Sequence, residues 1–169
     1  MDLEELRALQ APIKDRYRSD PEAAVVTLSA SGELSTEQIA CSVATGRALV
    51  EAGLHPASGG SGSLACSGDM LLEALVACAG VTLKAVATAL EFRLDGGRIM
   101  AEGDLDFRGT LGVAKDARVG FKAIRLSFEL DTDEPPERIA TLQKLTERYC
   151  VVMQSLRTPP DIVLQVTTA

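Results

Sequence analysis

The chain has 169 residues, of which 46% are apolar and 24% charged, with a net charge of −7. That size suits one domain with a short extension. The negative charge and an aromatic content of 4% argue against a nucleic acid or an anionic membrane as a partner. No uninterrupted run of about 18 apolar residues is present, which disfavours a membrane span. The start of the chain, MDLEELRALQ, lacks the basic and apolar stretches of a secretory signal, so we expect a cytoplasmic protein.

The first third of the chain predicts one helix and two strands. Residues 2–18 have apolar residues at helical spacing, with Pro12 as a kink or break. Residues 23–29 and 38–44 are rich in β-branched and small apolar residues and predict strands. Residues 53–69 are rich in glycine and serine and predict a loop.

The remaining elements are larger. A long helix is expected from about residue 67 to residue 92, and alternating patterns over 98–108 and 119–131 predict strands. Two prolines open a helix over 137–149, and residues 162–166 predict a last strand. Strands and helices do not alternate regularly, so the fold class is α+β rather than a βαβ fold.

The long helix is almost wholly apolar. Its few charged residues, Glu73, Lys84 and Glu91, fall on nearly one stripe. Such a helix is expected to be buried on most of its circumference, against sheets or a second subunit. Cys78 lies about 140° around the helix from Glu73 and therefore faces away from the charged stripe. From composition alone, packing as a small hydrophobe is the better explanation of Cys78, and reactivity is the alternative.

The four cysteines form no CxxC pair, and His55 is the single histidine. A disulfide framework, a zinc site and a histidine-activated nucleophile are therefore disfavoured. Cys150 begins a short helix in the pattern, where the positive end of the helix dipole is expected to lower its pKa. Packing is the alternative role for Cys150. Cys41, in a strand, and Cys66, in a loop, are weaker candidates for catalysis.

Two segments resemble the OsmC/organic hydroperoxide resistance family. In residues 68–80, GDMLLEALVACAG, an acidic residue leads into an apolar helix, and Asp69 precedes Cys78 by nine positions as in that family. Residues 149–156, YCVVMQSL, are similar to the family's Cys-Pro-Val-Ser-type segment that ends in leucine. The order and separation also fit, so the resemblance extends over roughly residues 23–168. We accordingly divide the chain into an N-terminal helical extension, 1–20, and an OsmC-like domain, 21–169.

The resemblance implies an intertwined homodimer with a long buried central helix packed against antiparallel sheets. It further implies active sites at the subunit interface, a peroxidatic Cys78 and a resolving Cys150. The expected activity is thiol-dependent reduction of organic hydroperoxides in the oxidative-stress defence of a bacterium. A thiolate attacks the peroxide and becomes a sulfenic acid, and a second thiol condenses with it to a disulfide. No bound cofactor is expected, and an external dithiol, for example a lipoylated protein, would restore the thiols.

Peroxidatic members of the family also use an arginine near the first cysteine, held by an acidic residue. Asp69 matches the acidic position, although capping of the long helix would explain it equally well. Arg47 is the best candidate for the arginine, with Arg16 and Arg18 as alternatives. An exposed arginine is ordinarily part of the surface, which is the other interpretation of Arg47.

Val151 stands where the family often has proline, and Met153 where serine is common. We expect these departures to change the start of the short helix and not the thiol. His55 could line the mouth of the pocket or lie in solvent, and the glycine-rich stretch lacks the ending of a phosphate-binding loop. Two rival hypotheses remain: a non-catalytic small-molecule-binding or redox-sensing OsmC-like protein, and an unrelated dimer with structural cysteines.

Overall fold

The structure is a computed structural model of the chain, and it describes residues 2–20, 25, 32–34, 40–44, 49–112 and 114–168. Its helices are α1 (Leu3–Ser19), the 3-10 helix η2 (Pro56–Ser58), α2 (Ser67–Ala89), α3 (Phe107–Thr110), α4 (Pro136–Tyr149) and α5 (Val151–Arg157). Its strands are β1 (Gly32–Leu34), β2 (Ala40–Ala44), β3 (Leu49–Gly53), β4 (Ala65–Cys66), β5 (Gly96–Leu105) and β6 (Phe121–Asp131).

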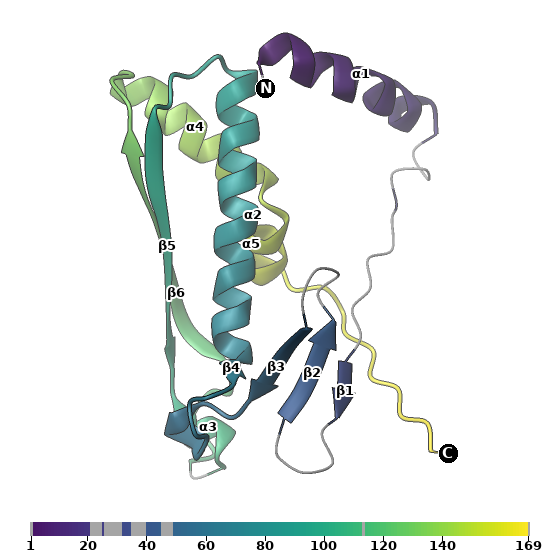
Figure 1. The fold of residues 1–169 in the computed structure, drawn as a ribbon, viewed down its shortest axis with the longest axis vertical. Coiled ribbons are helices and arrows are strands. Elements are labelled where there is room, and N and C mark those ends of the chain that lie inside the picture. Colours follow the sequence, from purple (N-terminus) through teal and green to yellow (C-terminus); the bar gives the residue numbers. More distant parts are fainter. Residues whose placement is uncertain are drawn as a thin grey trace.

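The strands form two separate sheets. The first has the order β1-β2-β3-β4, antiparallel except where β4 pairs with β3 in parallel. The second is the long antiparallel ribbon of β5 and β6, in which Met100 lies opposite Ser127. A β-bulge between Asp104 and Leu105 shifts the register near one end of the ribbon. The small sheet lies near the N-terminal end of α2, and the ribbon runs along its length (Figure 1).

Helix α2 is the centre of the fold. It packs against β5 of the ribbon and against α4 and α5 (Figure 1). Two clusters of buried residues lie along it; one contains Leu83, Val86, Ala87, Phe92 and Leu142, and the other contains Leu75, Ala79 and Cys150. The second cluster is therefore where the middle of α2 meets the junction of α4 and α5.

The two ends of α2 are held differently. At its start the N-cap residue, Cys66, makes no side-chain capping hydrogen bond. At its end Glu91 adopts a positive φ of 49°, and the Arg138 guanidinium of α4 donates to the carbonyl oxygens of Leu90 and Glu91 at 2.8 and 3.2 Å. Arg138 also pairs with Glu134. Because the last carbonyls of a helix have no partner within it, Arg138 supplies what the helix itself cannot.

The predicted α+β class and most of the larger elements are confirmed, with shifted ends. The helix α1 continues through Pro12, and α2 ends at Ala89 rather than near residue 92. The predicted loop at 53–69 contains η2 and β4, and α2 already begins at Ser67. The predicted strand over 23–29 lies outside the described residues except for Val25. Neither the domain boundary at residue 20 nor the homodimer is tested by a single chain, so both stay predictions.

One predicted element is absent from the described structure. Residues 162–166 form no strand; Ile162 and Leu164 are 88% and 87% exposed, because no described strand pairs with this segment. The expected burial of α2 against a second subunit stays a prediction, and Val81 on this helix is 74% exposed in the described part of the single chain. The helix α2 has a mean hydropathy of 1.8 over 18 residues, so by length and composition alone it could span a membrane. Core helices of globular proteins share this property.

Candidate active site

Two cysteines from distant parts of the chain meet in the second buried cluster. Cys78 lies midway along α2 and, like Val152 and Met153, packs against the buried cluster that contains Cys150. Cys150 is completely buried at the junction of α4 and α5, whereas Cys78 is partly exposed. Both are free thiols, and each is close enough to shift the pKa of the other. The structure thus brings together the two cysteines that the family resemblance implied as a pair.

The break between α4 and α5 determines what Cys78 meets. Cys150 is both the C-cap residue of α4 and the N-cap residue of α5, and its backbone is extended, with φ −72° and ψ 106°. Its N–H donates to the Thr146 carbonyl at 3.0 Å, and its own carbonyl accepts from Gln154 N–H at 2.9 Å. The chain therefore changes direction at a single residue, and the free N–H groups of the first turn of α5 are left beside the Cys78 sulfur.

Those groups lower the pKa of Cys78. Burial raises the pKa of the Cys78 thiol, but hydrogen bonds from the backbone N–H of Val152, the Cys150 thiol, the backbone N–H of Val151 and the Thr82 hydroxyl outweigh burial and lower the pKa overall. Donors that point at sulfur favour the thiolate, which accepts hydrogen bonds better than the neutral thiol. The thiolate is the nucleophilic form of cysteine.

Cys150 behaves in the opposite way. Burial raises its pKa above that of an ordinary cysteine, and the neighbouring Cys78 raises it further. Hydrogen bonds from the N–H groups of Met153 and Val152 offset this only in part. The expectation that the helix start would lower the pKa of Cys150 is therefore wrong. Burial of the thiol raises its pKa by more than the N–H groups of the short helix lower it.

The departure at Val151 matters more than the sequence indicated. We expected it to leave the thiol unaffected, yet the Val151 N–H is one of the groups that lower the Cys78 pKa. A proline at this position would have no N–H to donate. Thr82, one helical turn beyond Cys78, was also missed as a hydrogen-bonding residue. The i, i+4 spacing of Cys78 and Thr82 could have indicated it.

Asp69 and His55 lie elsewhere. Asp69 is in the first turn of α2, about 13 Å along the axis from Cys78, and the capping interpretation is wrong because Cys66 is the N-cap. Asp69, His55 and Cys66 line a separate cavity of about 380 Å³ that Cys78 does not reach. There the His55 ring stacks on Phe107 at 5.0 Å, and its Nδ1 accepts from Ala57 N–H. The structure therefore gives Asp69 no contact with the pair of thiols.

The predicted arginine is not found beside Cys78 in the described part of the chain. Arg47 lies outside the described residues. Arg18, one of the alternatives, pairs with Asp15 on α1 at 2.5 Å, and Arg16 is exposed on the same helix. The groups that shift the pKa of Cys78 are backbone N–H groups, a thiol and a hydroxyl, and no guanidinium is among them.

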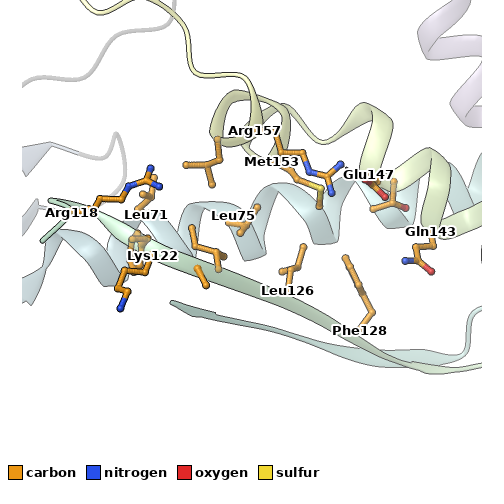
Figure 2. A pocket seen from close by; sticks show the side chains of 16 residues that line it. Leu71, Leu75, Arg118, Lys122, Leu126, Phe128, Gln143, Glu147, Met153 and Arg157 are labelled. Atoms are coloured by element: carbon orange, nitrogen blue, oxygen red, sulfur yellow. Dashed lines mark hydrogen bonds and ion pairs between the residues drawn. The ribbon is translucent and has the colours of Figure 1, made fainter. Parts of the chain in front are cut away.

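A large cavity lies next to the thiols. It measures about 600 Å³ and is lined by α2, β6, α4 and α5 (Figure 2). Leu75 and Met153, which both belong to the thiol cluster, form part of its wall, but neither Cys78 nor Cys150 does. The Thr146 hydroxyl, on a residue that also lines the cavity, is buried without a hydrogen-bond partner in the described part of the chain.

The fold and the site define an α+β protein in which a thiol on a long central helix meets a second thiol at the junction of two later helices. Residues 60–165 match the family model described as OsmC-like protein, so the chain belongs to the OsmC-like family. None of the curated proteins compared with the chain matches it by sequence.

Solved structures agree with this family in fold. An OsmC-like protein from Mycoplasma pneumoniae superposes with a TM-score of 0.67 at 14% identity, covering 79% of this chain and 89% of that one. Organic hydroperoxide resistance proteins from Elizabethkingia anophelis and Legionella pneumophila give TM-scores of 0.64 and 0.61 at 13% and 14% identity. They cover 80% and 79% of this chain and 91% and 92% of their own.

Proposed function

We propose that the protein reduces organic hydroperoxides with Cys78 as the attacking thiolate and Cys150 as the resolving thiol. The observation that carries this proposal is the contact between two thiols whose pKa values are shifted in opposite directions. An attacking sulfur works as a thiolate, whereas a resolving thiol that stays protonated does not compete for the peroxide. Membership of a family whose solved relatives include organic hydroperoxide resistance proteins supports the same activity.

The proposed reaction has three steps. The Cys78 thiolate attacks one oxygen of the peroxide, the O–O bond breaks, and the leaving alkoxide takes a proton to become an alcohol while Cys78 becomes a sulfenic acid. The Cys150 sulfur then attacks the Cys78 sulfur, which releases water and forms a disulfide. An external dithiol, which we propose to be of the lipoyl type, reduces the disulfide and is itself oxidised. No cofactor is needed for these steps.

The preference for organic peroxides follows from the surroundings of the thiols. Leu75, Val152 and Met153 pack around the pair, and an apolar cavity adjoins them. Such walls favour an alkyl group over the small, strongly hydrated hydrogen peroxide.

The test is consumption of an organic hydroperoxide by the purified protein with a dithiol reductant. Cys78→Ser is expected to abolish turnover, and Cys150→Ser is expected to stop it after one equivalent with sulfenic acid on Cys78. Cys66→Ser is the matched control, because Cys66 is a free thiol outside the pair. Mass spectrometry of the oxidised parent protein should find the Cys78–Cys150 disulfide. Full activity in Cys78→Ser, or a disulfide that joins other cysteines, would overturn the mechanism.

One observation favours the alternative, a non-catalytic binding or redox-sensing protein. No guanidinium is among the groups that act on Cys78 in the described part of the chain, whereas the peroxidatic pattern includes one. Under this alternative, peroxide oxidises the two thiols to a disulfide only slowly. Excess reductant then gives no sustained consumption of peroxide. Stopped-flow measurement of Cys78 oxidation by an organic hydroperoxide separates the two functions.

A further inference from the structure

Helix α5 has only 7 residues, so its place beside Cys78 depends on contacts outside the helix. Isolated helices of this length are not stable in water. Val152 and Met153 pack against the cluster of buried residues that contains Cys150. Val151, however, is 69% exposed, and residues 159–168, which follow α5, form no helix or strand. Few interactions therefore fix the direction of the first turn of α5.

The side chain of Gln154 supplies one of these interactions. Its Nε2 donates to the backbone carbonyl of Glu147 at 2.7 Å, across 7 positions of the chain. Its backbone N–H donates to the Cys150 carbonyl at 2.9 Å and closes the first turn of α5. Glu147 lies in the last turn of α4, where the carbonyl oxygens have no partner within the helix. Gln154 thus joins the first turn of α5 to the end of α4.

The Glu147 carbonyl is also the oxygen that the Val151 N–H would reach in an uninterrupted helix, because an α-helix pairs each N–H with the carbonyl four residues earlier. At the break between α4 and α5, the Gln154 amide takes this carbonyl instead. The Val151 N–H is then left for the Cys78 sulfur, on which it acts as a hydrogen-bond donor. The amide of Gln154 and the N–H of Val151 have in effect exchanged acceptors.

A second contact between α4 and α5 is more exposed. Arg157 lies three residues beyond Gln154, on the same side of α5, and points toward the carboxylate of Glu147, with which it forms an ion pair (Figure 2). The side chains of Arg157 and Glu147 are 58% and 38% exposed. Because exposed ion pairs contribute little, we expect the partly buried hydrogen bond of Gln154 to have the larger effect on α5.

We propose that Gln154 is a positioning residue for Cys78, because its amide replaces the Val151 N–H at the Glu147 carbonyl and so leaves that N–H directed at the Cys78 sulfur. Without the amide, the Glu147 carbonyl lacks a donor and draws the Val151 N–H toward itself. The sulfur then loses a donor. As a part of peroxide reduction this role rests on the function proposed above, but the arrangement of the donors involves no peroxide.

The test is the pH dependence of Cys78 alkylation by iodoacetamide in the full chain, resolved by mass spectrometry. Gln154→Met keeps the length of the side chain and removes its donor. The pH midpoint of Cys78 alkylation should rise, and the rate near neutral pH should fall about threefold, less than after removal of the Val151 donor itself. Ser155→Met places the same side chain at an exposed neighbouring position of α5 and is the matched control. Arg157→Gln should have a smaller effect than Gln154→Met.

A rescue variant separates positioning from a general loss of helix stability. Gln154→Lys supplies an ammonium group that can donate to the Glu147 carbonyl. In about 1 M salt the screening length is about 3 Å, so the added charge acts little on Cys78. Under these conditions Gln154→Lys should restore the alkylation rate and the midpoint of the parent protein. Cys150 should remain slow to label in every variant, since α5 changes direction without unfolding.

An unchanged midpoint in Gln154→Met, an equal change in Ser155→Met or a larger one in Arg157→Gln would overturn the proposal. Failure of Gln154→Lys to restore the rate, or rapid labelling of Cys150 in Gln154→Met, would show that α5 has unfolded rather than turned. None of these measurements uses peroxide. Retention of hydroperoxide consumption in Cys78→Ser would therefore refute the proposed function and leave the role of Gln154 standing, so the two failures are distinguishable.

Discussion

The middle of α2 and the junction of α4 and α5 each contribute one cysteine to the same contact, but they treat the sulfur in opposite ways. On α2, Cys78 is partly exposed and has hydrogen-bond donors around it, which lower its pKa. At the junction, Cys150 is completely buried, and its pKa is raised. The helix start that belongs to Cys150 in sequence thus acts mainly on Cys78 in space. What matters is which sulfur the free N–H groups meet, rather than which residue caps the helix.

The largest expected effect is a difference in reactivity between the two cysteines. Iodoacetamide should label Cys78 before Cys150 in the native protein, by more than about tenfold near neutral pH, because the thiolate reacts and the buried thiol does not. A lowered pKa keeps Cys78 ionised to lower pH, so its labelling rate should fall with acidification at a lower pH than that of an unfolded control peptide. Site-resolved mass spectrometry measures both rates, and faster labelling of Cys150 would contradict the comparison.

Val151→Pro sharpens the comparison by removing one N–H donor. Proline suits the first position of a helix, so α5 should remain intact while the Val151 donor to Cys78 is lost. The pKa of Cys78 should rise and its alkylation near neutral pH should slow about fivefold, the effect of one hydrogen bond to a charged acceptor at a partly exposed site. Val151→Ala keeps the N–H and is the control. Equal alkylation rates of Cys78 in the two variants would show that the Val151 N–H does not lower the pKa of Cys78.

Thr146→Val tests the buried side of the comparison. Thr141, on the same helix, donates its hydroxyl to the Glu137 carbonyl at 2.9 Å, but the buried Thr146 hydroxyl has no partner in the described part of the chain. Replacing that hydroxyl with a methyl group of similar size should raise the free energy of unfolding by about 1 kcal/mol. Thr141→Val should change it little or lower it. Denaturant unfolding measures both, and destabilisation by Thr146→Val would show that the hydroxyl is satisfied after all.

The smallest effect is expected from Thr82→Val. The hydroxyl of Thr82 is the weakest of the groups that lower the pKa of Cys78, so its loss should slow alkylation only about twofold. Thr82→Ser should restore the parent rate. Thr88→Val, in which the lost hydroxyl bonded to the Lys84 carbonyl, is the matched control on the same helix. A larger effect from Thr88→Val than from Thr82→Val would show that helix stability, not the sulfur, responds.

Much of the fold could be predicted because its elements carry strong patterns. The long apolar helix α2, the alternating strands β5 and β6, and α4 after two prolines were all expected. Residues 162–166 also predicted a strand, but a sequence pattern does not show whether a partner strand is present, and this segment has none among the described residues. The sequence also predicted that α2 would be buried against sheets or a second subunit, but the pattern does not show which of the two would cover Val81.

The site was less predictable. The pairing of Cys78 with Cys150 followed from the family resemblance, because nothing in the spacing of the cysteines shows that they meet. The donors around Cys78 depend on the turn of the backbone at one residue, and side-chain patterns do not report where a backbone N–H points. Asp69 was assigned by its offset from Cys78, but nine residues of helix separate the two by more than a side chain can reach.

Arg138 has a mechanical consequence for the pair of thiols. Its hydrogen bonds join the first turn of α4 to the end of α2, and the packing of Cys150 joins the end of α4 to the middle of α2. The helix between them has 14 residues and spans about 21 Å. Because both ends of α4 contact α2, the length of α4 determines which turn of α2 lies against Cys150. Any movement that accompanies disulfide formation would therefore fall on the short helix α5, while α2 and α4 keep their alignment.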